Sequence, residues 1–289
     1  MQYLNYINSN KNIDLYSYLK RNLIGFASDG ASVMLGKHNG LIRKLEKNLN
    51  KKLYGIHCMA HRLRLLLRKP FEQISQLHEL ESTINSVYNF YSRSHKIKAH
   101  LRQTAFSLKV NITELSYIYK ERWISSEYGA IKEFNRSWLV LHTDLEAIST
   151  DNLQFNPATR SKASDILNRI REREFVMNIQ FLLDFLSSFS QYNLLLQKRA
   201  GLVIGAESIR TGMLNIAQAL KSKDGHNLVN FYYSLECSNA PNRVCSMANY
   251  ISADKVYWQK KELTRSKSYL NEYREQFLNN ITQQINKEN

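Results

Sequence analysis

The stretch Leu23-Ile24-Gly25-Phe26-Ala27-Ser28-Asp29-Gly30 decides how the first part of this chain is interpreted. The compact apolar run from Leu23 to Ala27 predicts a short buried strand, and Ser28-Asp29-Gly30 ends it with turn chemistry. Residues 41–49 follow as a basic amphipathic helix, and residues 53–57 form a second short apolar run. This succession predicts a small α/β piece with two or three strands over residues 1–70.

Beyond that piece, the sequence has the periodicity of helices. Only 10 glycines and 3 prolines occur in 289 residues, and turn-rich β architectures need both in quantity. Leu77, Leu80, Ile84, Val87 and Tyr91 have the spacing of one buried helix face. The expected helices cover residues 13–22, 59–70, 77–91, 94–108, 131–145, 159–198, 201–221, 226–236 and 256–285.

The sequence therefore predicts a mostly α protein with a small α/β part. The expected segments are an α/β piece at 1–70, a helical stretch at 71–110, a core strand at 111–126 and an all-helical domain at 127–289.

Positive charge is concentrated near the start of the chain. The protein has a net charge of +15 and a pI near 9.6. Residues 1–70 hold 13 Lys/Arg against 3 Asp/Glu, whereas residues 71–289 hold 27 against 22. Such a field attracts phosphate backbones or anionic membrane surfaces. A solvated basic face without a partner is the alternative interpretation.

Several protein classes are disfavoured by the sequence. No apolar run approaches the roughly 18 residues that a membrane-spanning helix needs, and the first residues lack the pattern of a signal peptide. Three cysteines, Cys58, Cys237 and Cys245, are too few and too scattered for a disulfide framework, which indicates a reducing compartment. We expect an intracellular protein, nuclear or nucleo-cytoplasmic, with no membrane partner.

Two motifs carry potential catalytic chemistry. Asp29, at the carboxyl end of a strand and beside Gly30, is well placed to bind a metal ion or a phosphate; capping of the next helix is the alternative. Cys58 and His61 lie three residues apart and would face one metal ion or one active site. Zinc needs four ligands, and no second Cys-x-x-His or Cys-x-x-Cys pair is present, so a helix start with a buried Cys is the alternative there.

Nucleic-acid contacts are predicted from a second group of residues. Arg122-Trp123 suits phosphate contact and base stacking, although such a pair is common. The cations expected to contact phosphates are Lys44, Lys47, Lys51 and Arg62.

In their order and spacing, these segments resemble the hAT transposase superfamily and its domesticated relatives. The resemblance is carried by Ser28-Asp29-Gly30-Ala31-Ser32, by Cys58-x-x-His61-Arg62-Leu63, by Arg122-Trp123-x-Ser125 and by the helical run with Asn193 and Gln197. It spans nearly the whole chain, since residues 273–285 resemble the helix that closes the family's insertion domain.

The resemblance implies a partial RNase H-like fold followed by a large all-α insertion domain at about residues 72–285. In that family three acidic residues bind two divalent metal ions, Mg²⁺ or Mn²⁺. Asp29 matches the second acid, and Cys58 with His61 matches the motif beside the active site. Arg122 and Trp123 match the Arg-Trp pair that follows the next strand.

Matches to the other two acids are missing, because they would lie before residue 1 and after residue 289. Asp29 would then be a vestigial and incomplete metal site, and this chain would use no cofactor. We expect a non-catalytic, transposase-derived domain that binds DNA. The alternatives are a fragment of an active hAT transposase, which would cleave DNA only in its full-length form, and a helical scaffold for protein partners or full-length transposase relatives.

Overall fold

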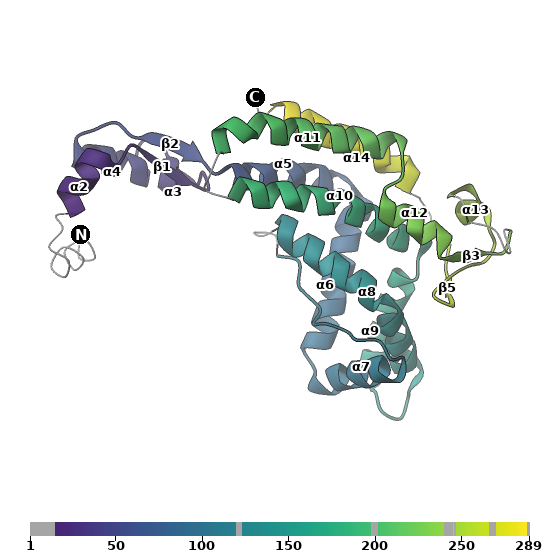
Figure 1. Ribbon diagram of the computed structural model, residues 1–289. Helices are drawn as coiled ribbons and strands as arrows, with labels where there is room; N and C mark the ends of the chain where they lie inside the picture. Colours follow the sequence, from purple (N-terminus) through teal and green to yellow (C-terminus); the bar gives the residue numbers. More distant parts are fainter. Residues whose placement is uncertain are drawn as a thin grey trace. The chain divides into compact units, whose positions relative to one another are not determined.

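The computed structural model, drawn in Figure 1, describes residues 15–119, 123–197, 202–239, 245, 247–265 and 270–287. The chain divides into two compact units, Met1–Leu65 and Leu66–Asn289. Each unit is described by itself below. The predicted division at residue 70 falls within a helix, α5, that runs from Met59 to Gln73.

The first unit is a small α/β structure built on two parallel strands. Helix α2 (Leu15–Asn22) precedes strand β1 (Gly25–Ser28), and helices α3 (Ser32–Leu35) and α4 (Leu41–Leu49) connect β1 to strand β2 (Tyr54–His57). Gly25 lies opposite Tyr54 and Ser28 opposite His57. The two predicted strands and the helix over residues 41–49 are therefore observed. The expectation that the first strand is buried is wrong, because Gly25, Phe26 and Ser28 are only partly buried and Ala27 is exposed.

A small apolar cluster holds this unit together. Its buried members are Ile42, Leu49 and Leu53, and partly buried apolar residues of α2, β1, α3 and α4 pack against them. Lys51 fastens the end of α2, because its Nζ donates to the carbonyl oxygens of Lys20 and Arg21 at 3.0 and 3.2 Å. These are two of the carbonyls that a helix leaves without a partner at its carboxyl end.

The second unit is mostly helical. Its helices after α5 are α6 (Ser75–Ser92), α7 (His95–Ser107), α8 (Trp123–Thr150), α9 (Pro157–Ile170), α10 (Arg173–Gln197), α11 (Leu202–Ser222), α12 (His226–Tyr233), α13 (Met247–Ser252) and α14 (Leu270–Lys287). All five residues of the face predicted for residues 77–91 are buried in α6. Helix α8 packs against α9 and α10, and α10 also contacts α11, α12 and α14.

Aromatic side chains fill the centre of this unit. Phe181, Phe185 and Phe189 are fully buried along α10. The ring of Phe277 from α14 meets Phe185 edge-on, with 5.0 Å between Phe277 and Phe71 and 5.1 Å between Phe277 and Phe185. Phe181, Phe185 and Phe189 lie within the helix that the sequence predicts over residues 159–198.

The expectation of an all-helical domain over residues 127–289 is wrong. Strands β3 (Leu235–Cys237), β4 (Val256–Trp258) and β5 (Lys261–Leu263) form an antiparallel sheet, so the helix predicted at 256–285 is confined to its second half. Gln259 and Lys260 connect β4 to β5 with φ angles of 50° and 64°. A two-residue hairpin turn of this kind usually carries Asn-Gly or Asp-Gly, and the sequence lacks that signal.

No strand occurs in residues 111–119 of the described chain, and residues 123–126 belong to α8, so the predicted core strand at 111–126 is not observed. The reason lies in Asn85 of α6. Its side chain accepts from the Ile118 amide at 2.9 Å and donates to the Ile118 carbonyl at 3.5 Å. The buried Ile118 backbone is thus paired by a side chain rather than by a neighbouring strand.

Two predicted helices have different limits in the structure. Pro70 lies inside α5, which continues to Gln73 with Leu67 and Phe71 buried on either side. The block predicted at 159–198 divides at Arg171 and Glu172. There the backbone bonds to Thr264 instead, since Arg173 N–H donates to the Thr264 carbonyl and Thr264 N–H donates to the Arg171 carbonyl.

Cys237 and Cys245 form a disulfide, with Cα atoms 6.2 Å apart. The sequence predicted that the cysteines are too scattered for a disulfide framework, but the fold brings these two, eight positions apart, within disulfide range. The cysteines no longer argue for a reducing compartment. Within the residues that the structure describes, no helix combines the length and apolar character that crossing a bilayer requires.

Candidate functional site

The carboxyl ends of β1 and β2 meet at one edge, because the two strands are parallel. Asp29 directly follows β1, while His57 ends β2 and Cys58 follows it. The Cys58 amide donates to the Ser28 carbonyl at 2.7 Å, which holds the two strand ends together. The structure thus brings Asp29 and Cys58 to the same edge, as the sequence indicated.

Asp29 is an exposed residue held by its own turn. Its Oδ1 accepts from the Ala31 amide at 3.1 Å, which is the two-residue bond of an Asx turn. Ala31 is also the N-cap residue of α3, and no side chain caps that helix at this position. Asp29 therefore shapes the loop after β1 and keeps its second carboxylate oxygen for other contacts.

His57 is a member of this site that we did not predict. Gly30 has a φ of +82°, and a Cβ on it would lie 2.6 Å from Nε2 of His57, so the loop packs directly on the imidazole ring. The same Nε2 is buried and has no hydrogen-bond partner within the described part of the chain. The available signal was its position as the last residue of an otherwise apolar strand.

His61 lies beside His57 with 5.4 Å between ring centroids, and its Nε2 is 3.4 Å from a guanidinium nitrogen of Arg64. Burial lowers the pKa of His61, the charges of Arg64 and His57 lower it further, and Asp29 opposes them. Burial and the neighbouring positive charges therefore favour the neutral form of His61, and Asp29 lies close enough to oppose this effect.

These residues do not fit a metal-binding set. Among the residues that the structure describes, no three His, Cys, Asp or Glu side chains are placed to hold one ion. Cys58 is a free, partly buried thiol. The edge offers one carboxylate, two imidazoles and a thiol, and we derive no metal-dependent step from it.

The predicted phosphate-contacting cations differ in their surroundings. Lys44 and Lys47 are exposed on α4, opposite the buried Ile42 and Leu49. Lys51 is engaged at the end of α2, as described above. The partly buried Arg62 approaches the Met59 sulfur at 3.9 Å. Only the first two present their ammonium groups freely to solvent.

The Arg-Trp motif is outside what the structure establishes. Arg122 lies outside the described residues. Trp123 begins α8, but its side chain is likewise outside the described part. Of the helical run that contributed to the resemblance, Asn193 is buried in α10.

No protein-family model matches this chain. No solved structure matches it either. The resemblance to hAT transposases therefore rests on the quoted sequence motifs alone.

Proposed function

We propose that this chain is a transposase-derived nucleic-acid-binding domain of hAT type, and that exposed lysines around α4 contact the phosphate backbone. The observation that carries this proposal is a group of four exposed lysines, here called the α4 lysines: Lys37, Lys44, Lys47 and Lys52. In the described part of the chain none of the four makes an ion pair or a side-chain hydrogen bond.

Few acidic residues compensate this positive charge, and Glu46 interacts electrostatically with one of the four lysines, Lys52. Asp29 and Glu46 are the acidic residues of the described part of the first unit. Glu46 is already engaged, because it pairs with Arg43 at 2.5 Å and accepts from the Leu53 amide at 2.9 Å. These bonds, the amide first, lower the pKa of Glu46 and keep it charged in this role. The α4 lysines are therefore available to an external anion.

Helix geometry supports a shared contact. Lys44 and Lys47 lie three residues apart, so their side chains project from one face of α4 on successive turns. The opposite face is fixed in the apolar cluster by Ile42 and Leu49. Contacts of this kind, from lysine to phosphate, give affinity with little sequence preference.

Descent from an RNase H-like core is part of the proposal. Parallel strands with Asp29 at a carboxyl end support it, as does the Cys58-x-x-His61 motif at the start of the next helix. A two-metal reaction needs several carboxylates, and the edge has one. We therefore propose binding rather than cleavage for this chain, in the nucleus.

The test is fluorescence anisotropy with a labelled DNA duplex. The change Lys44→Gln/Lys47→Gln is expected to weaken binding on the order of tenfold at low salt, because two phosphate contacts are lost. The control Lys223→Gln/Lys287→Gln removes the same charge from exposed positions of the second unit and should change binding less than about twofold. Equal effects of the two variants, or no binding at all, would reject the proposal. The same duplex incubated with Mg²⁺ should remain intact, and cleavage abolished by Asp29→Ala would instead favour the enzyme.

A protein-interaction role is the second candidate, and one observation favours it. Tyr54 and Ile56 of β2 are 69% and 54% exposed, and in the described residues their sheet has two strands only. Exposed apolar edge strands pair readily with an added strand. DNA binding that is absent or insensitive to salt would leave this candidate in place of the first.

A further inference from the structure

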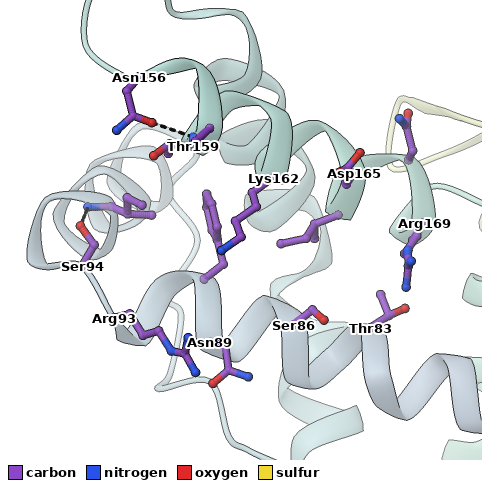
Figure 2. A pocket seen from close by; sticks show the side chains of 15 residues that line it. Thr83, Ser86, Asn89, Arg93, Ser94, Asn156, Thr159, Lys162, Asp165 and Arg169 are labelled. Atoms are coloured by element: carbon purple, nitrogen blue, oxygen red, sulfur yellow. Dashed lines mark hydrogen bonds between the residues drawn. The ribbon is translucent and has the colours of Figure 1, made fainter.

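A groove of about 780 Å³ lies between α6 and α9 in the second unit. Figure 2 shows its lining side chains, with Lys162 and Arg169 reaching from α9 toward α6. Phe90, Ile97 and Ile166 supply buried apolar surface at its base. The remaining lining residues are mainly amides, hydroxyls and charged groups, so the groove combines apolar surface with hydrogen-bonding and charged groups.

The groove carries a net positive charge. Arg93, Lys162 and Arg169 line it, and Asp165 is the single acid among the lining residues. Within the described chain, none of these three cations makes an ion pair or a side-chain hydrogen bond. A ligand with several negative groups would find free partners on both sides of the groove.

Thr83 gives a second, independent indication of a ligand. This residue of α6 lines the groove, is only 1% exposed, and its Oγ1 has no hydrogen-bond partner among the described residues. A buried polar group without a partner is unfavourable, so such groups are rare unless something else satisfies them. An acceptor oxygen of a ligand in the groove would do so.

The spacing of the cations indicates the size of the ligand. Lys162 and Arg169 are seven residues apart, which corresponds to about 10 Å along α9 and to the same helix face. Both side chains can therefore contact successive phosphates of one nucleic-acid strand. A cavity of this volume is in the range of small-ligand pockets.

We propose that the α6–α9 groove binds the phosphate groups of single-stranded nucleic acid, a few nucleotides long. Arg93 and Arg169 would hold phosphate oxygens with their forked guanidinium groups, Lys162 would add a point charge, and Thr83 would donate to a phosphate or sugar oxygen. This deepens the proposed function, on which it rests. It assigns single strands to the second unit and duplex DNA to the α4 lysines.

The experiment measures binding of a labelled oligothymidylate of about 12 nucleotides to the full chain. Lys162→Gln/Arg169→Gln should weaken it on the order of tenfold, while Lys223→Gln/Lys287→Gln should change it less than about twofold. Duplex binding should respond in the opposite way, with loss in Lys44→Gln/Lys47→Gln and little change in the groove variant. A groove variant that behaves like its control overturns this inference, and unchanged duplex binding in the α4 variant overturns the proposed function instead.

Two further arms separate the possible ligands. Thr83→Val should weaken oligothymidylate binding a few-fold without lowering the melting temperature, because the lost hydroxyl has no partner in the free protein. A melting temperature that falls, with binding unchanged, contradicts the role of Thr83. Competition by thymidine monophosphate as strong per phosphate as by the oligomer would identify a free nucleotide as the ligand. Equal competition by polyglutamate would overturn the preference for phosphate.

Discussion

Gly30 is the residue on which the loop after β1 depends. Its φ of +82° is disfavoured for any side chain, and a Cβ there would collide with the His57 ring. We expect Gly30→Ala to destabilise the first unit by about 1–3 kcal/mol, from backbone strain together with displacement of His57. The labelling rate of the free Cys58 thiol reports this opening directly. Gly129→Ala is the control, because a Cβ there meets nothing within 4 Å and Gly129 lies within α8; its labelling rate should not increase.

Glu127 is a buried carboxyl whose two oxygens have no partner within the described residues. Burial, and then the charge of Glu81, raise its pKa well above the usual range. For a raised carboxyl pKa, the neutral form is favoured in the folded state, so stability is full below the unfolded pKa of about 4.3 and is lost as the pH rises through the folded value. We therefore expect Glu127→Gln to stabilise the protein by about 1–3 kcal/mol at pH 7 and by much less at pH 4. Urea unfolding at the two pH values measures the difference, and a destabilised variant at pH 7 would show that the carboxylate has a partner.

At the scale of elements, hydrophobic periodicity predicted those helices whose buried residues form one continuous apolar stripe along the helix. Helix α6 could be predicted from Leu77, Leu80 and Ile84, because these residues lie on one helix face and are buried in the core. The β4–β5 hairpin gave no comparable signal, since a three-residue strand is too short to show alternation and its turn residues, Gln259 and Lys260, are not typical of hairpins. The buried position of Trp258, 4.4 Å from the ring of Trp138, is determined by long-range packing.

The candidate site was predictable to a similar extent. Asp29 and Cys58 follow apolar runs and so could be placed at strand ends. The partners of Lys51 and the orphan nitrogen of His57 depend on distances between segments, which no local pattern contains. The α6–α9 groove is determined in the same way, because its cations come from two helices separated by more than sixty residues. Periodicity assigns Lys162 and Arg169 simply to an exposed helix face.

Asp144 connects three helices through one buried carboxylate. It accepts from Tyr91 of α6 at 2.9 Å, and from His100 and Thr104 of α7 at 2.7 Å each. Removing this acceptor leaves buried donors unpaired, so we expect Asp144→Ala to destabilise the protein by about 3–5 kcal/mol. Asp144→Asn should be milder because one acceptor oxygen remains. Asp165→Ala, at an exposed position, is the control for equilibrium unfolding in urea, and equal losses in the Asp144 and Asp165 variants would refute the connecting role.

At the scale of the whole molecule, the pH dependence of stability should reveal His142. Its side chain is 5% exposed, and burial, then the charge of Lys261, lower its pKa to about 4. For this depressed histidine pKa, the unfolded chain takes up a proton as the pH falls below about 6.5, while the folded chain stays neutral until about pH 4. The free energy of unfolding should therefore fall over that window, by about 2–3 kcal/mol from His142.

Glu127 acts in the opposite direction over part of that range, so the comparison of wild type with His142→Gln isolates the histidine. The variant should lose the His142 part of the slope between pH 6.5 and 4.5 and keep the rest. Below that window, Glu146 contributes as well, because its bond to Lys261 lowers its pKa and this stabilisation disappears on protonation. If the free energy of unfolding depends on pH in the same way in wild type and His142→Gln, His142 would be solvated in the folded protein.

The distribution of free charge over the whole chain leads to the last prediction, which concerns salt. Residues 1–65 hold 11 Lys/Arg against 3 Asp/Glu, and in the described part of this unit the α4 lysines have no ion-pair partner. Four neutralised phosphates give a slope of about −3 to −4 in log affinity against log salt on duplex DNA. Lys44→Gln/Lys47→Gln should halve that slope, since two of the four contacts are gone. Lys51→Gln should leave the slope nearly unchanged but lower the free energy of unfolding, because Lys51 bonds to the carboxyl end of α2. Titrations between about 50 and 200 mM salt give each slope separately from the affinity. A flat response in the wild type would mean that the lysines are solvated surface, and a slope unchanged in the double variant would place the phosphate contacts on other cations of the chain.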